Sequence, residues 1–126
     1  MKAGIAKLDI TPALGANLNG YYRERPADRV IEPLYVTALA FSDGENTALA
    51  ISLDISEILQ RDTDDIRNRI AQQTGLPFEA VFVACIHTHT APVYPRTQRS
   101  GGHFMSNSSR MTLETMLRPG QRYVEK

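Results

Sequence analysis

Hydrophobic and polar positions alternate at the start of the chain and then gather into longer apolar runs. Residues 4–10 alternate with a period of two, which predicts a strand with one buried face that stops before Pro12. Residues 34–41 and 47–53 are apolar on both faces, and the polar residues 42–46 between them predict a β-hairpin. Because both hairpin strands lack a polar face, we expect a sheet that is covered on each side.

A helical period follows the hairpin. Three apolar residues fall at i, i+7 and i+11 and so share one stripe of the expected helix: Leu59, Ile66 and Ile70. Ser56 or Asp62 is expected to cap the start of this helix, and Gly75 followed by Pro77 predicts its end. The apolar run at residues 80–86 predicts another buried strand. A strand, helix, strand passage favours a right-handed parallel crossover, so the predicted fold class is α/β with a mixed β-sheet covered by helices.

Two histidines stand directly after this last strand, within the sequence of residues 87–92. Because alternate side chains of an extended backbone share a face, His87 and His89 are predicted to point to the same side. Their place is the carboxyl end of a strand, where open α/β sheets bind their ligands. Two neutral imidazoles provide one metal ligand each, or one ligand plus a group that hydrogen-bonds substrate. The alternative is a pair of surface histidines.

The long segment at residues 13–33 has the length and composition of a binding loop. Its candidate substrate-binding residues are Gly20, Tyr21 and Arg23. Gly20 would admit close approach of a ligand to the backbone, and Arg23, like Arg25, would hold an anionic or hydroxylated group. A simple turn glycine and solvated arginines are the alternatives.

Three further residues bear on the site. Asp54 ends a buried strand and either supports a metal ligand as a hydrogen-bond acceptor or caps the following helix. Cys85 precedes His87 by two residues and could share its face, but a buried strand cysteine that behaves as a small hydrophobe is favoured. His103 lies in a Gly/Ser-rich stretch and is expected to be solvent-exposed.

Composition excludes several classes of partner. The chain has 126 residues, 42% of them hydrophobic, which predicts one folded unit with a real core. Lys plus Arg equals Asp plus Glu at 14 each, so we expect no nucleic acid partner and no attraction to an anionic membrane. No apolar stretch approaches the roughly 18 residues of a membrane span, and the start lacks the apolar core of a secretory signal. The expected location is the cytoplasm.

Charge divides the chain into two parts. Residues 1–96 hold 9 Lys/Arg against 12 Asp/Glu, whereas residues 97–126 hold 5 against 2. The second part is basic, contains glycine and serine runs, and has few strongly apolar residues. It is therefore expected to be a poorly ordered or atypical tail.

Several motifs follow one another in the order known from a protein family. They are residues 3–12, Gly20-Tyr21, Pro33-Leu34, Ser52-Leu53-Asp54 and residues 87–92. Together they resemble the N-terminal domain of the neutral/alkaline non-lysosomal ceramidases over about residues 3–96. The histidine motif of that family usually reads Thr-His-Thr-His-Ser-Gly-Pro. Here Ile86 replaces the leading threonine and Thr90-Ala91 replaces Ser-Gly, while both histidines are kept.

The resemblance implies a function. Enzymes of the family bind one Zn²⁺ through histidines, a glutamate and a tyrosine, and cleave the amide of an N-acylated sphingoid base. It implies that His87 is a zinc ligand, that His89 is a catalytic-site residue and that the substrate is a small amphiphilic amide. It also implies that the other ligands lie in a missing C-terminal part of the domain, so the sheet here is incomplete. The alternative is a truncated or frame-shifted fragment that catalyses nothing and binds metal weakly or not at all.

Overall fold

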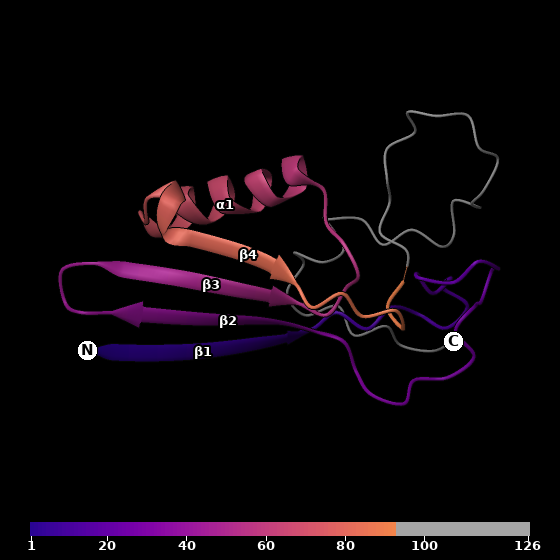
Figure 1. Ribbon diagram of the computed structural model, residues 1–126. Helices are drawn as coiled ribbons and strands as arrows, with labels where there is room; N and C mark the ends of the chain where they lie inside the picture. The colour runs from indigo at the N-terminus through magenta and orange to yellow at the C-terminus, as the bar shows by residue number, and fades with distance from the viewer. Residues whose placement is uncertain (93–126) are drawn as a thin grey trace.

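The computed structural model describes residues 1–92. The expectations for the basic tail, for the boundary after Arg96 and for His103 lie outside these residues. The described elements follow one another along the chain as in Figure 1: β1 (Lys2–Asp9), β2 (Tyr35–Ser42), β3 (Thr47–Leu53), α1 (Gln60–Thr74), the short 3-10 helix η1 (Phe78–Ala80) and β4 (Val81–Cys85).

The four strands form one mixed sheet in the order β1-β2-β3-β4. β1 pairs with β2 and β2 with β3 in antiparallel fashion, while β3 and β4 are parallel. α1 provides the crossover between the two parallel strands, as the passage from strand to helix to strand predicted. The predicted α/β class with a mixed sheet is confirmed.

The β2–β3 hairpin is closed by a compact turn. The Oδ1 atom of Asp43 accepts hydrogen bonds from the backbone N–H groups of Glu45 and Asn46, at 2.9 and 2.7 Å. The N–H of Asp43 donates back to the carbonyl of Asn46 at 3.2 Å, and Gly44 takes a left-handed φ of 108°. An aspartate that binds the backbone of the next residues is the ordinary reason for a turn at such a sequence.

Helix α1 packs its predicted stripe onto the sheet. Ile66 is buried, and Leu59 and Ile70 pack against the same core. The helix ends as predicted, because Gly75 adopts φ 75° and its N–H binds the carbonyl of Ala71 at 2.9 Å. Within the described part of the chain, no helix is both long and apolar enough to cross a membrane.

The predicted N-terminal cap of α1 is wrong. The cap position is Leu59, which makes no side-chain capping hydrogen bond, so neither Ser56 nor Asp62 caps the helix. The helix begins at Gln60, and Asp62 lies within its first turn. Ser56 stands too far upstream to cap the helix, and its hydroxyl is bound to the loop before β2 instead.

The two faces of the sheet differ in their cover. α1 lies over one face, where residues from β3, β4 and the helix form the buried core: Ile51, Leu53, Ile66 and Val81. On the other face Ile5, Phe41 and Phe82 expose 75%, 42% and 66% of their surface. Among residues 1–92, helical cover is therefore present on one side only. The two-sided cover expected for the hairpin strands is not seen here, because the single crossover places its helix on one face.

Candidate metal-binding site

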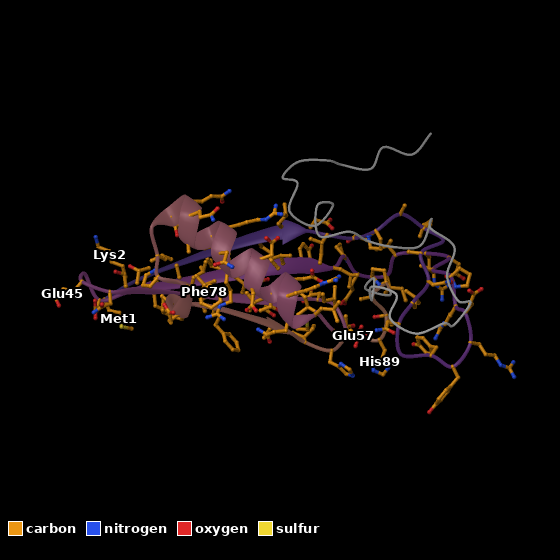
Figure 2. The ribbon with its side chains drawn as sticks, turned by 90° about the horizontal axis from the view of Figure 1, so that it is seen from above. Met1, Lys2, Glu45, Glu57, Phe78 and His89 are labelled. Atoms are coloured by element: carbon orange, nitrogen blue, oxygen red, sulfur yellow. The ribbon has the colours of Figure 1, made fainter. Side chains whose placement is uncertain are left out.

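Three chain segments meet at one end of the sheet. β3 and β4 are parallel, so their carboxyl ends lie at the same edge. The chain keeps pairing just beyond the strands: the N–H of Ile86 binds the carbonyl of Leu53, and that of His87 binds the carbonyl of Ile55, both at 3.1 Å. Figure 2 shows His89 and Glu57 at this end and Met1, Lys2 and Glu45 at the opposite one. The predicted position of the site, at strand carboxyl ends, is thus where both histidines lie.

The ring of His87 is held by a backbone carbonyl. Its Nδ1 atom lies 2.7 Å from the carbonyl oxygen of Ser56. Because a carbonyl oxygen only accepts hydrogen bonds, Nδ1 carries the proton, which leaves the lone pair of a neutral ring on Nε2. The residue is exposed. His87 therefore offers an oriented Nε2 of the kind that metal-binding histidines present.

His89 lies beside His87, although the predicted reason for this is wrong. The two ring centroids are 5.0 Å apart with an interplanar angle of 70°. The extended strand ends at Cys85, and His87 has a φ of 63° in the left-handed region. The rings therefore come together through a turn rather than through strand alternation, and positive φ is uncommon for a residue with a side chain.

The loop at residues 13–33 contacts His89 through its Gly20-Tyr21 segment. Gly20 has φ 82°, and a Cβ atom at this position would overlap the imidazole of His89. The ring of Tyr21 meets that imidazole edge-on, with centroids 6.5 Å apart. The guanidinium of Arg25 lies 4.6 Å above the Tyr21 ring, and Arg23 is exposed. The substrate-binding roles predicted for Gly20, Tyr21 and Arg23 remain predictions.

Backbone hydrogen bonds tie this loop to the chain after the histidines. The N–H of Asn19 binds the carbonyl of Ala91 at 2.9 Å, and Leu18 bridges to Pro92. Ala91 and Pro92 are fully buried. The loop and the histidine turn therefore form one packed unit.

Two residues of the site were not expected from the sequence. The side-chain amide of Asn19 donates a hydrogen bond to the hydroxyl of Ser56, which is only 4% exposed. Ser56 stood out in the sequence only as a possible helix cap, and Asn19 only as one polar residue of the loop. The available signal was that each is a short polar side chain within two residues of a candidate site residue, Gly20 for Asn19 and Asp54 for Ser56.

The observed contacts of Asp54 are with β2. Its Oδ2 atom accepts a hydrogen bond from the N–H of Tyr35, and its own N–H binds the carbonyl of Tyr35, both at 2.9 Å. The carboxylate thus fixes the start of β2 to the end of β3. It does not cap α1, and its predicted support of a metal ligand remains a prediction.

Cys85 packs against the hydrophobic core. Burial raises the pKa of its thiol, and the negative charge of Glu57 raises it further. Its packing against the core fits the reading of Cys85 as a small hydrophobe rather than as a third ligand beside the histidines.

The donor set that the structure describes is small. Among residues 1–92 no group of three or more His, Cys, Asp and Glu side chains is arranged to hold a metal ion. His87 fits zinc as a single ligand, because imidazole nitrogen is a preferred zinc donor and its other ring nitrogen is already bound. Any complete site needs donors beyond those brought together in this part of the chain.

The fold is ceramidase-like. The structure of neutral ceramidase from Pseudomonas aeruginosa matches with a TM-score of 0.62 and 23% sequence identity, over 72% of this chain. A ceramidase structure described as complexed with C2 matches with a TM-score of 0.60 and 22% identity, again over 72% of this chain. The matched region is 15% of each of those chains. No protein-family model and no curated protein matches the sequence.

Proposed function

We propose that this chain carries the histidine-bearing part of a zinc-dependent amide hydrolase resembling neutral ceramidase, which cleaves an N-acylsphingosine-type amide into fatty acid and sphingoid base. The observation that carries the proposal is the state of His87, whose Nδ1 is bound to the Ser56 carbonyl while the ring is exposed. The ceramidase-like fold and the neighbouring imidazole of His89 support it.

Each residue has a defined part in the proposal. His87 holds zinc through Nε2, and bound zinc supplies a Lewis acid for the acyl carbonyl. His89, exposed and 5.0 Å from the His87 ring, exchanges a proton or a hydrogen bond with the amide. Tyr21 and Arg23 contact the polar part of the amphiphilic substrate, and Gly20 lets the loop approach His89.

The proposal assigns further zinc ligands to polypeptide outside residues 1–92. A catalytic zinc normally uses three protein ligands and a water, and the described residues bring no such group together. The matched ceramidases are much longer than the region in common, so they contain the additional polypeptide that such a site needs. We therefore expect the 126-residue chain alone to release no fatty acid at a useful rate.

The first experiment is a titration of the purified chain with Zn²⁺ and with Co²⁺, whose absorption reports ligand type. His87→Ala is expected to lose binding that the matched variant His103→Ala retains. Equal loss in both variants would defeat the ranking of the two histidines. Absence of any binding above the His87→Ala background would favour the alternative, a fragment without a metal site.

The second experiment assays fatty-acid release from an N-acylsphingosine and from a simple N-acyl amide. The 126-residue chain with zinc is expected to be inactive. Zinc-dependent turnover that disappears in His87→Ala would show that the chain is an enzyme by itself and that no ligand from outside it is required.

A further inference from the structure

A polar pair lies behind the two histidines without belonging to the proposed ligands. The side-chain amide of Asn19 donates to the hydroxyl of Ser56 across 37 residues of sequence. Ser56 is almost fully buried at 4% exposure, and Asn19 is partly buried. This hydrogen bond is worth more than one at the surface, because the buried Ser56 hydroxyl finds no water as a substitute when it breaks.

Ser56 has a second contact that leads directly to the site. Its carbonyl oxygen accepts the hydrogen bond from Nδ1 of His87 at 2.7 Å. Asn19 thus holds the side chain of the residue whose backbone holds the ring of His87. The carbonyl is aimed by the orientation of the Ser56 peptide, which the Asn19 contact restrains.

The backbone of Asn19 also contacts the segment that carries His89. Its N–H binds the carbonyl of Ala91, two residues after His89, and the next residue in the loop, Gly20, packs against the His89 imidazole. Residues 19 and 20 therefore contact the supports of both histidines at once. Displacing Asn19 would affect the two rings together.

We infer that Asn19 and Ser56 are positioning residues that keep His87 in its Nδ1-protonated form and seat His89 beside it. The hydrogen bonds of a neutral imidazole set which nitrogen carries the proton, and here Nδ1 faces the Ser56 carbonyl oxygen. If the Ser56 carbonyl turns away, the Nε2-protonated form competes, and that form has no lone pair on Nε2. The consequence for zinc rests on the proposed function, but the effect on the ring does not.

Loss of this support has a specific chemical signature. The left-handed φ of 63° at His87 is strained for a residue with a side chain and persists only when its surroundings fix it. Without the Asn19–Ser56 pair, the His87 ring is expected to sample both protonated forms and more than one orientation. A residue that merely stabilised the fold would lower the unfolding free energy without changing this ratio in the folded protein.

The test uses the whole 126-residue chain and four variants. Asn19→Ala and Ser56→Ala each remove one half of the pair. Asn19→Asp keeps a hydrogen bond, with the Ser56 hydroxyl now donating to the carboxylate, and serves as the conservative replacement. Ser42→Ala is the matched control, because it removes a serine hydroxyl that is hydrogen-bonded in the hairpin at the far end of the sheet.

Long-range ¹H–¹⁵N NMR spectra at about pH 8, where ordinary imidazoles are neutral, report the protonated nitrogen of each histidine. The unaltered chain, Asn19→Asp and Ser42→Ala are expected to show His87 protonated on Nδ1. Asn19→Ala and Ser56→Ala are expected to show a mixture. An unchanged Nδ1 signal in both of these folded variants would overturn the inference, as would a mixture in the unaltered chain.

Zinc titration of the same samples gives the second readout. Outer contacts of metal ligands typically change affinity by roughly 10- to 100-fold, and a loss of this size is expected in Asn19→Ala and Ser56→Ala. If the unaltered chain binds no zinc, this second readout bears on the proposed function alone, and the NMR result still decides the positioning role. Should Ser56→Ala not fold, the two Asn19 variants, at a partly buried loop position, carry the test.

Discussion

The two ends of the sheet are built in different ways. At the hairpin end, Ser42, Asp43 and Asn46 make hydrogen bonds between residues two to five positions apart. At the histidine end, four side-chain hydrogen bonds join residues 19 to 37 positions apart, beside the local contacts of Thr11 with Asp9 and of Thr88 with Thr90. One end is closed by its own short sequence, and the other is assembled from three separate segments.

This difference has consequences for stability and for the site. A short turn closes with little loss of chain entropy, and its hydrogen bonds depend on few residues outside it. The contacts at the histidine end join residues that are distant in sequence, so they require the long loops between those residues to be closed. The geometry that serves the proposed chemistry is therefore the part that is sensitive to substitutions in several places.

The largest difference between the two ends is expected for glycine-to-alanine substitutions. Gly20 and Gly44 both have positive φ, at 82° and 108°, so alanine is strained at either position. A Cβ at Gly20 would also overlap the His89 ring, whereas nothing lies within 4 Å of one at Gly44. We expect a loss of about 1 kcal/mol for Gly44→Ala and about 3 kcal/mol for Gly20→Ala in urea unfolding, since strain and overpacking add.

Gly15→Ala is the control for this comparison. Gly15 lies in the same loop as Gly20, has φ 88°, and leaves open space for a Cβ. It should behave like Gly44→Ala and leave the NMR signals of His89 in place, while Gly20→Ala shifts them. Equal losses for all three variants would mean that the contact with His89 contributes nothing beyond backbone strain.

A smaller effect is expected for Asp54, whose carboxylate accepts a backbone N–H group. Asp54→Ala leaves the N–H of Tyr35 without its acceptor, and it breaks a contact between residues 19 positions apart. An unsatisfied donor of this kind costs about 1–2 kcal/mol, so urea unfolding should show a loss of that size. Asp54→Asn keeps an acceptor oxygen and should retain most of the stability. If Asp54→Ala and Asp54→Asn unfold alike, the hydrogen bond to Tyr35 is not what Asp54 contributes.

The same contrast explains which parts of the fold the sequence reveals. The hairpin, the end of α1 at Gly75 and the strand before the histidines depend on local patterns, and the structure has them at or within a few residues of the predicted places. The cover of the sheet does not follow from a local pattern. Apolar residues on both faces of a strand indicate that both faces need to be covered, but not which element within residues 1–92 covers each of them.

The site contains more contacts that the sequence does not predict. The spacing of His87 and His89 predicts that their rings lie close together. It does not predict the left-handed turn at His87 that brings them together, because no glycine or asparagine stands at that position. The contact between Asn19 and Ser56 spans 37 residues, and no local rule connects them. The sequence favours a capping role for Ser56, because a serine upstream of a helical stripe is a common cap. In the structure its hydroxyl instead accepts a hydrogen bond from Asn19.

The stability of the two ends should depend on pH in opposite ways. At the histidine end, burial raises the pKa of the Cys85 thiol and Glu57 adds to this. Above about pH 9, the ordinary pKa of a thiol, the unfolded chain holds fewer protons than the folded one. The free energy of unfolding should therefore be unaffected by this group at neutral pH and fall as pH rises above about 9.

The measurement for Cys85 is the difference in unfolding free energy between the unaltered chain and Cys85→Ala from pH 7 to pH 10.5. Alanine has no thiol to ionise, so this difference should shrink at high pH. Glu57→Gln should weaken the trend only partly, because burial is the larger cause. A difference that stays constant across the range would show that the thiol ionises equally in both states.

The smallest expected effect is at the hairpin end, where acid rather than alkali matters. The backbone N–H of Asn46, and next that of Glu45, lower the pKa of Asp43 below its ordinary value of 3.8. A lowered pKa means that the group stabilises the fold fully above about pH 4 and loses this contribution as pH falls through the folded pKa. Because Asp43 is exposed, the change in midpoint temperature should be slight.

Asp43→Asn mimics the protonated side chain and keeps an acceptor oxygen. Its deficit in thermal melts should be present at pH 6 and vanish towards pH 2.5. At each pH the His87 and His89 signals of Asp43→Asn should match those of the unaltered chain, because a local turn does not reach the far end of the sheet. A deficit that persists at pH 2.5 would show that ionisation of Asp43 is not its cause, and a difference in either histidine signal between the two proteins at the same pH would show that the two ends are coupled.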